Sequence, residues 1–503
     1  MRALPFALLL LLPSVVYWQT VFHDYGFRDD YAHLREVRDE PGKLFRLTAS
    51  NGRPVYGAVL EASLRVGADI VPELPRLRSA SLLLLTAVGL VLWLHLRRSG
   101  WSDAEAMAIG AGVVLLPGAQ VVVGWAIAWP IALGLLLAVL GFWVVDAHLG
   151  RRGARRTVGL VGGALLYFVA GLTYQTSALF VVAPIAALLL VRDERSAPSD
   201  SRWVAAHLCI LFASLVGGFL LMNVVFTEGV VPEAARMNLE PHPFVKLLWF
   251  LRQPLPNSLA LFELRDRFNT HAPFWMALAA FSAIAVLGYV CGATSKQQRR
   301  RWLFCALLLP FVAHSVSLAA SSQAIGYRTL LPLSGLFLVL VVYGLRSLGR
   351  TSVGFVVTRV ALGVLVALAA GLANRNAFNL IAVPQNREWQ FVHFAASSLE
   401  LGSPPRVFIV RPMIDDRSTE RVYADEFGSL SADADWVAKE MFKTAMRERF
   451  PDALPDKAYF VETGFVPPEL PHDYALVIDM RALRKEGDRP LAVTAPLAAT
   501  SRR

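Results

Sequence analysis

The sequence contains about eleven mostly apolar stretches of roughly 16 to 24 residues, and this pattern limits the fold more than any other feature. A helix needs about 20 apolar residues to cross the ~30 Å hydrocarbon core of a membrane. The stretches lie at residues 3–22, 78–96, 104–123, 126–145, 157–173, 176–191, 203–226, 273–291, 302–320, 329–345 and 353–373. Hydrophobic residues make up 55% of the 503 residues and charged residues 17%, which is typical of a membrane protein. We therefore predict a mainly α fold, a polytopic bundle of transmembrane helices.

The basic residues predict how this bundle is oriented. The chain carries a net charge of +10, and Lys and Arg are retained on the cytoplasmic side of short loops. Alternate connections, together with Arg2, hold a net charge of about +11; they lie at residues 97–105, 151–156, 192–202, 296–301 and 346–350. Almost no net charge is left elsewhere, so the charge orients the chain and does not indicate a nucleic-acid partner. We expect the N-terminus to be cytoplasmic.

This orientation predicts the domain organisation. Residues 1–373 form the transmembrane domain, with long outer loops at 23–77 and 227–272. Residues 374–493 form a small extracytoplasmic α/β domain, because they contain β-like runs at 407–410 and 474–478 and a helical stretch at 436–450. Residues 494–503 are expected to be a disordered tail.

Two adjacent carboxylates, Asp29 and Asp30, follow the first apolar stretch by only seven residues. A low-dielectric surrounding and a like-charged neighbour both raise the pKa of a carboxyl group, as a general base near neutral pH requires. The alternative is that Asp30 caps a helix beginning at Tyr31 while Asp29 lies in solvent.

The same loop contains an arginine held in a turn. Gly52 and Pro54 flank Arg53, and a short apolar helix at residues 58–66 is expected to lie on the membrane surface. The guanidinium either grips a phosphate through its fork of donors or anchors to lipid headgroups.

The order of these motifs is similar to a known family. An N-terminal helix is followed by Asp29-Asp30-Tyr31, Gly52-Arg53-Pro54, Tyr174-Gln175 at the outer junction of two helices, and Tyr327-Arg328-Thr329-Leu330-Leu331-Pro332 at the start of another. In this order, and on one side of the membrane, the motifs resemble the polytopic GT-C superfamily glycosyltransferases, and within them the phage-type O-antigen glucosyltransferase family. The resemblance covers residues 1–373.

The resemblance implies a GT-C-like enzyme in a bacterial inner membrane, with the C-terminal domain in the periplasm. It would transfer a sugar from a polyprenyl-phosphate donor to an acceptor glycan or lipid on the periplasmic face, with inversion and with Asp29 or Asp30 as general base. Such a role belongs to O-antigen and lipopolysaccharide assembly in the cell envelope, beside a donor synthase and a flippase. Candidate donor-phosphate ligands are Arg53 and Arg328, then Lys246 and Arg252; candidate substrate-binding residues are Tyr31, Tyr174, Gln175 and Tyr327.

The aromatic run at residues 243–251 either lines the entry of the polyprenyl chain or belongs to a membrane-interface belt. The outer loops show no cluster of carboxylates and histidines at metal spacing. We therefore expect metal-independent transfer and no cofactor, with a divalent ion at Asp29 and Asp30 left open. Two other functions stay open: a polyprenyl-linked glycan transporter or flippase, and an enzyme like an O-antigen ligase or polymerase. A transporter would have ionisable residues near mid-membrane, whereas here the polar residues collect at the outer boundary, with Arg359 as the main exception.

Overall fold

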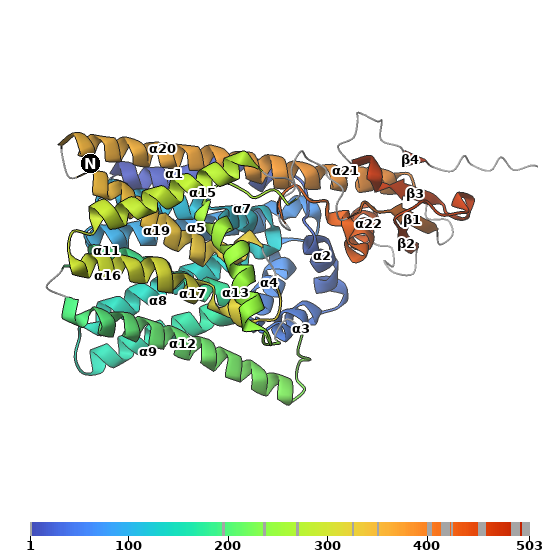
Figure 1. The fold of residues 1–503 in the computed structure, drawn as a ribbon. Helices are drawn as coiled ribbons and strands as arrows, with labels where there is room; N and C mark the ends of the chain where they lie inside the picture. Colours follow the sequence, from blue (N-terminus) through green and yellow to red (C-terminus); the bar gives the residue numbers. More distant parts are fainter. Residues whose placement is uncertain are drawn as a thin grey trace, which may run out of the picture.

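The chain folds into a long bundle of helices with a smaller α/β part at one end (Figure 1). The structure is a computed structural model. It describes residues 3–193, 197–234, 238–267, 271–323, 326–349, 352–399, 405–413, 423, 426–450, 459–483 and 493–494.

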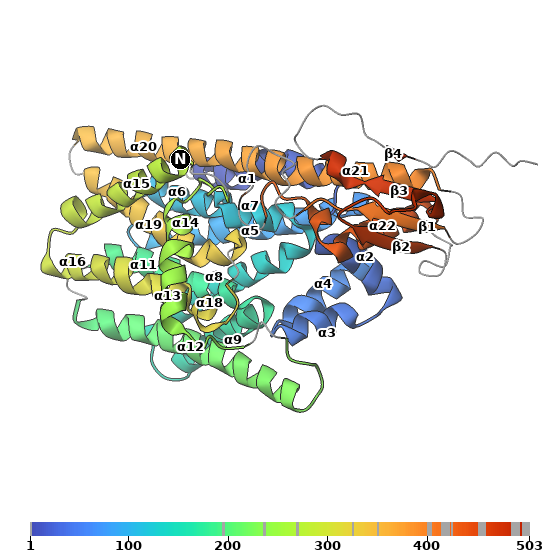
Figure 2. The same ribbon diagram turned by 45° about the vertical axis from the view of Figure 1, so that its right-hand side comes forward.

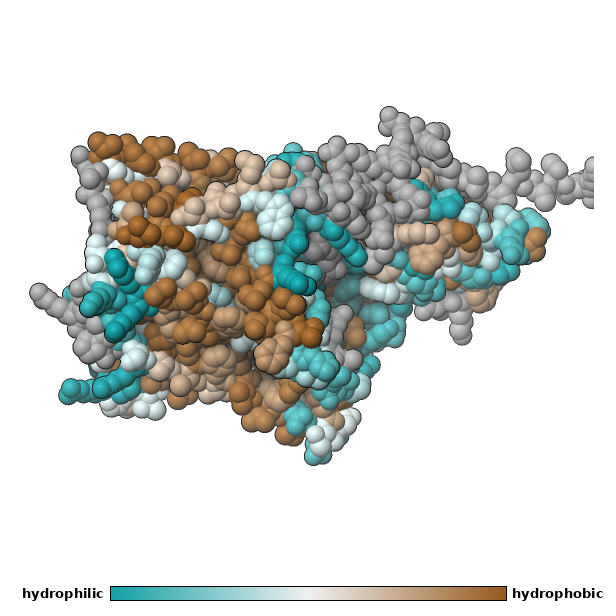
Figure 3. Space-filling view, in the orientation of Figure 1, coloured by the Kyte–Doolittle hydropathy of each residue, from teal (hydrophilic) through white to brown (hydrophobic). Residues whose placement is uncertain are grey.

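Eight helical segments among the described residues are long and apolar enough to cross a membrane. They are built around α1 (Ala3–Phe22), α5 (Pro75–Arg98), α8 (Trp129–Leu149), α9 (Ala154–Thr173), α12 (Ala197–Thr227), α15 (Ala272–Leu287), α19 (Leu331–Leu348) and α20 (Ser352–Ala377). Nearly all residues of α19 are buried, whereas α12, α15 and α20 expose many apolar side chains. These exposed side chains contribute to a broad hydrophobic band across the face of the helical part that Figure 3 shows, as expected of a surface in contact with lipid. The prediction of a mainly helical, multi-pass membrane protein is confirmed.

Three of the predicted spans are interrupted. The first consists of α6 (Asp103–Leu115) and α7 (Pro117–Gly124), which meet at an angle of 51° and make a ninth span if counted together. The break lies at Pro117, whose missing N–H suits the first turn of a new helix. The predicted spans 176–191 and 302–320 are made of short pieces: α10 (Gln175–Ala178), η3 (Leu179–Val181), α11 (Val182–Val191), α16 (Lys296–Leu303), η7 (Phe304–Leu308), α17 (Leu309–Ala313) and α18 (Ser315–Ala319). The expected number of about eleven spans is therefore higher than the eight or nine found in the described residues.

Short helices fill the two long loops. The first loop holds α2 (Asp29–Asp39), α3 (Lys43–Ser50), α4 (Pro54–Gly67) and η1 (Val71–Glu73), and the second holds α13 (Pro243–Arg252) and α14 (Pro254–Leu259). The helix predicted at residues 58–66 thus begins earlier, at Pro54, which again occupies the first turn. Three further short elements matter for the site or its surroundings: η2 (Ala126–Ala128), η8 (Tyr327–Leu330) and η6 (Gly288–Gly292).

The α/β part begins on a helix that leaves the bundle. Helix α20 continues through η9 (Phe378–Ala382) into α21 (Val383–Ser397). A four-stranded sheet follows, in the order β2-β1-β3-β4, with β1 parallel to β2 and β3, and β4 antiparallel to β3. Its elements are β1 (Arg406–Val410), η10 (Ser431–Asp433), α22 (Asp435–Arg449), β2 (Phe460–Gly464), η11 (Pro471–Asp473), β3 (Leu476–Asp479), η12 (Met480–Leu483) and β4 (Val493–Thr494). The predicted small α/β part is confirmed; of the expected tail, Thr494 pairs in β4 and residues 495–503 lie outside the described residues.

The α/β part packs on the first loop of the helical part. Helix α22 lies beside α2 in both ribbon views (Figures 1 and 2). Arg35 donates from Nε to Glu440 Oε2 at 2.7 Å, and Thr444 Oγ1 donates to the carbonyl of Tyr31 at 3.1 Å. Residues far apart in the sequence therefore meet at the start of α2, next to the two adjacent carboxylates.

Candidate active site

A buried arginine fixes the turn that leads from α1 to α2. Arg78 of α5 is fully buried, and its guanidinium donates to the carbonyls of Val21, His23 and Tyr25. Its Cζ also lies 3.6 Å from the centre of the Tyr25 ring. These three carbonyls lie at or beyond the end of α1, where no helical N–H donates to them. Arg78 therefore satisfies them and holds the chain in place just before α2.

Tyr31 closes the same turn. Its hydroxyl donates to the carbonyl of Gly26 at 2.9 Å and accepts from the Gly26 N–H at 3.2 Å. Its ring stacks on Trp389 of α21, with 5.6 Å between ring centroids. A Cβ at position 26 would come within 2.7 Å of the Tyr31 ring, so glycine alone fits there. The side chain of Tyr31 is fully buried, and its contacts are those of a residue that shapes the site.

Asp30 is fully buried and anchors α2 to the helical part. Its carboxylate accepts from the N–H of Phe27 at 2.8 Å and from the N–H of Ile127, in η2, at 3.1 Å. Burial raises the pKa of the Asp30 carboxyl to about 6, and Asp29 adds to the rise, while Arg78 and the two backbone hydrogen bonds oppose it. The capping alternative placed the helix start at Tyr31, but α2 begins at Asp29 and the Asp30 carboxylate binds backbone outside that helix.

Asp29 has different surroundings. Its side chain is partly buried, and within the described parts of the chain its carboxylate has no hydrogen bond or ion pair. The preceding residue, Arg28, has a φ of 47°, a conformation that costs a non-glycine residue about 1 kcal/mol or more. The N–H of Arg28 donates to Ser431 Oγ of the α/β part at 3.1 Å, and its guanidinium lies 3.8 Å from Asp433. The α/β part thus helps to hold the strained residue that presents Asp29.

The hydroxyl of Tyr56 is influenced electrostatically by several of the predicted site residues. Tyr56, in α4, donates to the carbonyl of Ile127 at 2.6 Å. Burial raises the pKa of Tyr56; Tyr174 and Asp29 raise it further, whereas Arg53 and Arg328 lower it. Four residues that the sequence predicted separately therefore lie within electrostatic reach of one hydroxyl.

Tyr174 and Gln175 position Arg53. Gln175 Oε1 accepts from Arg53 Nε at 3.0 Å, and the Arg53 Cζ lies 4.3 Å from the centre of the Tyr174 ring. The amide nitrogen of Gln175 donates to the carbonyl of Gly52 at 2.9 Å. Gln175 and Tyr174 thus hold the guanidinium of Arg53 in one orientation.

Arg328 is paired with an acidic residue of the C-terminal segment. Its Nη1 donates to Glu426 Oε1, and the other carboxylate oxygen of Glu426 accepts from the N–H of Tyr327 at 2.8 Å. The Arg328 Cζ lies 4.7 Å from the centre of the Trp125 ring, and Glu426 is buried. The hydroxyl of Tyr327 accepts from the N–H of Arg265 at 2.9 Å, so Tyr327 is buried and bonded within the protein.

Lys246 and Arg252 lie away from this group. Lys246 is buried on α13, donates to the carbonyl of Ser322 at 2.5 Å and lies 4.5 Å from the Trp249 ring; burial lowers its pKa. Arg252 is exposed at the end of the same helix. In the described ranges no contact joins either cation to Asp29 or Arg53.

Four residues of the site were not singled out from the sequence: Arg78, Tyr56, Trp125 and Glu426. Trp125 packs on Phe27 with 5.1 Å between ring centroids, and its buried Nε1 has no hydrogen-bond partner in the described part of the chain. Tyr56 lies in the same motif as Arg53, so its position was a usable signal. Glu426 lies 98 residues from Arg328 in a region without an identifiable motif, and no signal pointed to it.

No family model and no curated protein matches the sequence. One similar solved structure is the archaeal oligosaccharyltransferase AglB from Archaeoglobus fulgidus in complex with an inhibitory peptide and a dolichol-phosphate, with 13% identity and a TM-score of 0.42; the similarity covers 88% of this chain and 63% of that one. A second similar structure is ArnT from Cupriavidus metallidurans bound to undecaprenyl phosphate, with 14% identity and a TM-score of 0.41; the similarity covers 88% of this chain and 84% of that one. ArnT in the apo state is similar with 13% identity and a TM-score of 0.41, and the similarity covers 89% of this chain and 85% of that one. This chain thus spans less than two thirds of the length of the archaeal protein.

Proposed function

We propose that this protein is a membrane glycosyltransferase that moves a sugar from a polyprenyl-phosphate donor to an acceptor hydroxyl at the membrane surface. One observation carries the proposal: a partly buried carboxylate, Asp29, has no protein partner in the described residues and lies, with Arg53, within electrostatic reach of Tyr56. A carboxylate that can accept a proton and a cation that suits a phosphate, both near one hydroxyl, are what this transfer needs.

Asp29 acts as the general base. It takes the proton of the acceptor hydroxyl as that oxygen bonds to the anomeric carbon of the sugar. The bond from the anomeric carbon to the phosphate oxygen breaks at the same time, and the lipid phosphate leaves with the electron pair. Attack opposite the leaving group inverts the anomeric centre. Asp30 is unsuited to this role, because both of its oxygens accept backbone N–H groups and its side chain is fully buried.

Arg53 stabilises the departing phosphate. A guanidinium binds two phosphate oxygens through parallel hydrogen bonds, and Gln175 and Tyr174 already hold it in one orientation. The buried Nε1 of Trp125, which has no hydrogen-bond partner among the described residues, is a further donor near Arg328 that a small local movement would expose to the phosphate. Arg328 itself holds Glu426 and so acts through the C-terminal segment, as a positioning residue.

The proposed setting follows the sequence resemblance: a bacterial inner membrane with the site on the periplasmic face, an acceptor in the O-antigen or lipopolysaccharide, and a donor synthase and flippase as partners. The sugar is a hexose or pentose.

The test is complementation of a deletion strain, read by mass spectrometry of its cell-envelope glycans. We expect loss of a sugar branch on deletion and its return with the wild-type gene. Asp29→Asn should fail to restore the branch while keeping its expression and unfolding temperature, whereas Asp30→Asn should restore it at least in part. Restoration by Asp29→Asn would exclude Asp29 as base, and an unchanged glycan profile after deletion would overturn the transferase proposal.

A further inference from the structure

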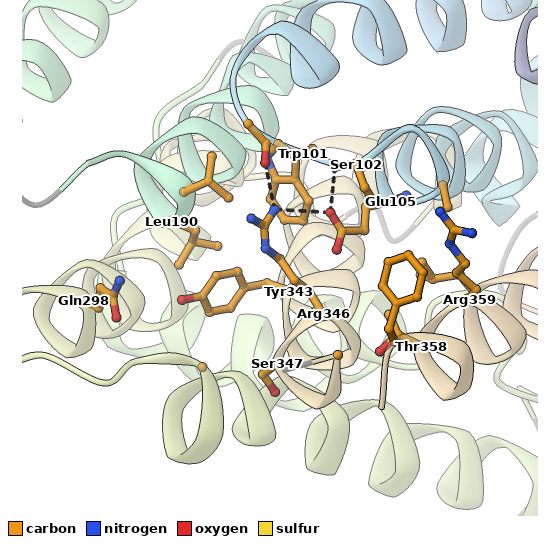
Figure 4. A pocket seen from close by; sticks show the side chains of 17 residues that line it. Trp101, Ser102, Glu105, Leu190, Gln298, Tyr343, Arg346, Ser347, Thr358 and Arg359 are labelled. Atoms are coloured by element: carbon orange, nitrogen blue, oxygen red, sulfur yellow. Dashed lines mark hydrogen bonds and ion pairs between the residues drawn. The ribbon is translucent and has the colours of Figure 1, made fainter. Parts of the chain in front are cut away.

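A cavity of about 620 Å³ lies at the end of the bundle opposite the α/β part. Its walls come from helix ends that are distant in the sequence: the chain between α5 and α6, the end of α11, the end of α19 and the start of α20. It shares no lining residue with the candidate active site. Figure 4 shows its side chains.

One wall of the cavity carries an internally balanced ion pair. Arg346 donates from Nη1 to Glu105 Oε2 and to the carbonyl of Gly100, each at 3.1 Å. Its Cζ lies 5.3 Å from the Trp101 ring, and Figure 4 shows it extending between Trp101 and Glu105. Because these two charges neutralise each other, the pair shapes the wall and leaves little attraction for a further charge.

A second arginine in the lining is not balanced in this way. Arg359 of α20 lies against the Phe355 ring, with its Cζ 4.1 Å from the ring centre. Among the described residues it has no hydrogen bond or ion pair, and Figure 4 shows it apart from Arg346. With Arg346 and Glu105 paired, the described lining carries a net charge of one positive unit, located at Arg359.

The rest of the lining and the position of α20 favour an amphiphile. Leu190, Val191 and Leu362 contribute apolar walls, and α20 exposes a row of valines along the face that borders the hydrophobic band. Arg359 lies about 10 Å along the axis from the first residue of this helix. The side chain of Arg359 is exposed, and a guanidinium within a lipid-facing helix is costly unless an anion or water reaches it.

We propose that this cavity binds an anionic phospholipid of the adjacent leaflet, with the lipid phosphate on Arg359 and an acyl chain along Phe355 and Leu362. Basic pockets between membrane helices are known sites for acidic headgroups. The apolar walls favour a lipid over a free phosphate ion, because a phosphate ion has no apolar surface to bury against them. The proposal does not depend on the transferase activity.

The test measures lipid binding to the full-length protein in detergent by native mass spectrometry. The probes are phosphatidylglycerol, phosphatidylcholine and inorganic phosphate. Wild-type protein should bind phosphatidylglycerol about tenfold or more tightly than phosphatidylcholine, and Arg359→Gln should lose that preference, since a charged hydrogen bond is worth about a factor of ten. Arg300→Gln is the matched control, because Arg300 is an exposed cation of α16 at the same end and does not line the cavity.

A second variant tests the cavity itself. Ala104→Trp leaves both arginines in place and fills the space beside them, so it should also weaken phosphatidylglycerol binding about tenfold. Its unfolding temperature without added lipid reports whether the fold is intact. Equal losses in the Arg300 and Arg359 variants, unchanged binding in Arg359→Gln, or tight binding of inorganic phosphate alone would each overturn the proposal.

Discussion

Two neighbouring carboxylates, Asp29 and Asp30, have different surroundings, and the different roles proposed for them rest on this difference. Asp30 is fully buried and accepts from the N–H groups of Phe27 and Ile127, whereas Asp29 is partly buried and has no hydrogen bond or ion pair among the described residues. The sequence placed both residues beside the membrane, but it could not separate them. The partner that captures Asp30, the N–H of Ile127, comes from a segment 97 residues away.

Asp30 should make the protein less stable as the pH rises from about 4 to about 6. Its pKa is about 6 in the folded protein against an ordinary value of 3.8. Because the folded pKa is the higher one, the stabilisation is fully present below about pH 4 and is lost above about pH 6, a change of about 3 kcal/mol. The measurement is the difference in unfolding temperature between wild type and Asp30→Asn across this range. A difference that stays constant with pH would contradict the assignment.

Arg53 should not be replaceable by lysine. Lysine lacks the planar fork and the Nε–H that Gln175 accepts, so we expect Arg53→Lys to lower transfer about 10- to 100-fold with an unchanged unfolding temperature. Transfer into envelope glycans by membranes of the two strains is the measurement. Arg252→Lys is the control, because Arg252 is exposed and lies apart from the site. Equal effects of the two substitutions would argue against a specific phosphate contact.

At the scale of elements, the break between α6 and α7 brings η8 close to the site. Gly118 permits this approach, since a Cβ there would lie 2.5 Å from the carbonyl oxygen of Tyr327 and 2.6 Å from Leu331 Cγ. Arg328 follows Tyr327 directly, so the spacing of these helices sets where its guanidinium lies.

Gly118→Ala should therefore displace η8. We expect a loss of about 1–3 kcal/mol in stability from the overpacked contact, and lower transfer. Gly162→Ala is the matched control in α9, because no heavy atom lies within 4 Å of a Cβ at that position. Thermal unfolding and envelope glycan profiles of both variants would check this; similar behaviour of the two would show that the close contact is unimportant.

The success of the sequence prediction differed between kinds of element. Long apolar helices were predictable because membrane thickness sets their length, and nine of the predicted stretches correspond to spans when α6 and α7 count as one. Residues 302–320 were apolar enough, but the π-helical turn at Phe304–Leu308 and Pro310 divide them. Strand β2 was missed because its residues, Phe460–Gly464, are mostly half-exposed and show no alternation of buried and exposed positions.

At the scale of the whole molecule, the α/β part and the first loop form one structure around Asp29. The contacts between them include the Arg35 to Glu440 pair, Thr444 on the carbonyl of Tyr31, and Ser431 on the N–H of Arg28. No local sequence pattern predicts these contacts, because each joins two segments more than 400 residues apart.

A charge exchange should test whether this docking supports activity. Arg35→Glu places a carboxylate against Glu440 and should lower both the unfolding temperature and transfer. Adding Glu440→Arg should recover part of both, with a coupling energy of about 1–3 kcal/mol between the two sites. The pair is nearly buried, so solvent screens it weakly. If the double variant is no better than Arg35→Glu alone, the pair does not couple the two parts.

The continuous helix from α20 through η9 to α21 has a mechanical consequence. A segment of 45 residues, Val353–Ser397, runs without a sharp break from the lipid-facing band to the α/β part. Helices adjust their tilt to the thickness of the bilayer, and a tilt of about 5° about the midpoint of this segment would move the far end of α21 by roughly 3 Å. Trp389 of α21 stacks on the ring of Tyr31, so a displacement of α21 would reach the turn that precedes Asp29. Transfer rates in bilayers of graded acyl-chain length should therefore pass through a maximum at the thickness that matches the hydrophobic band.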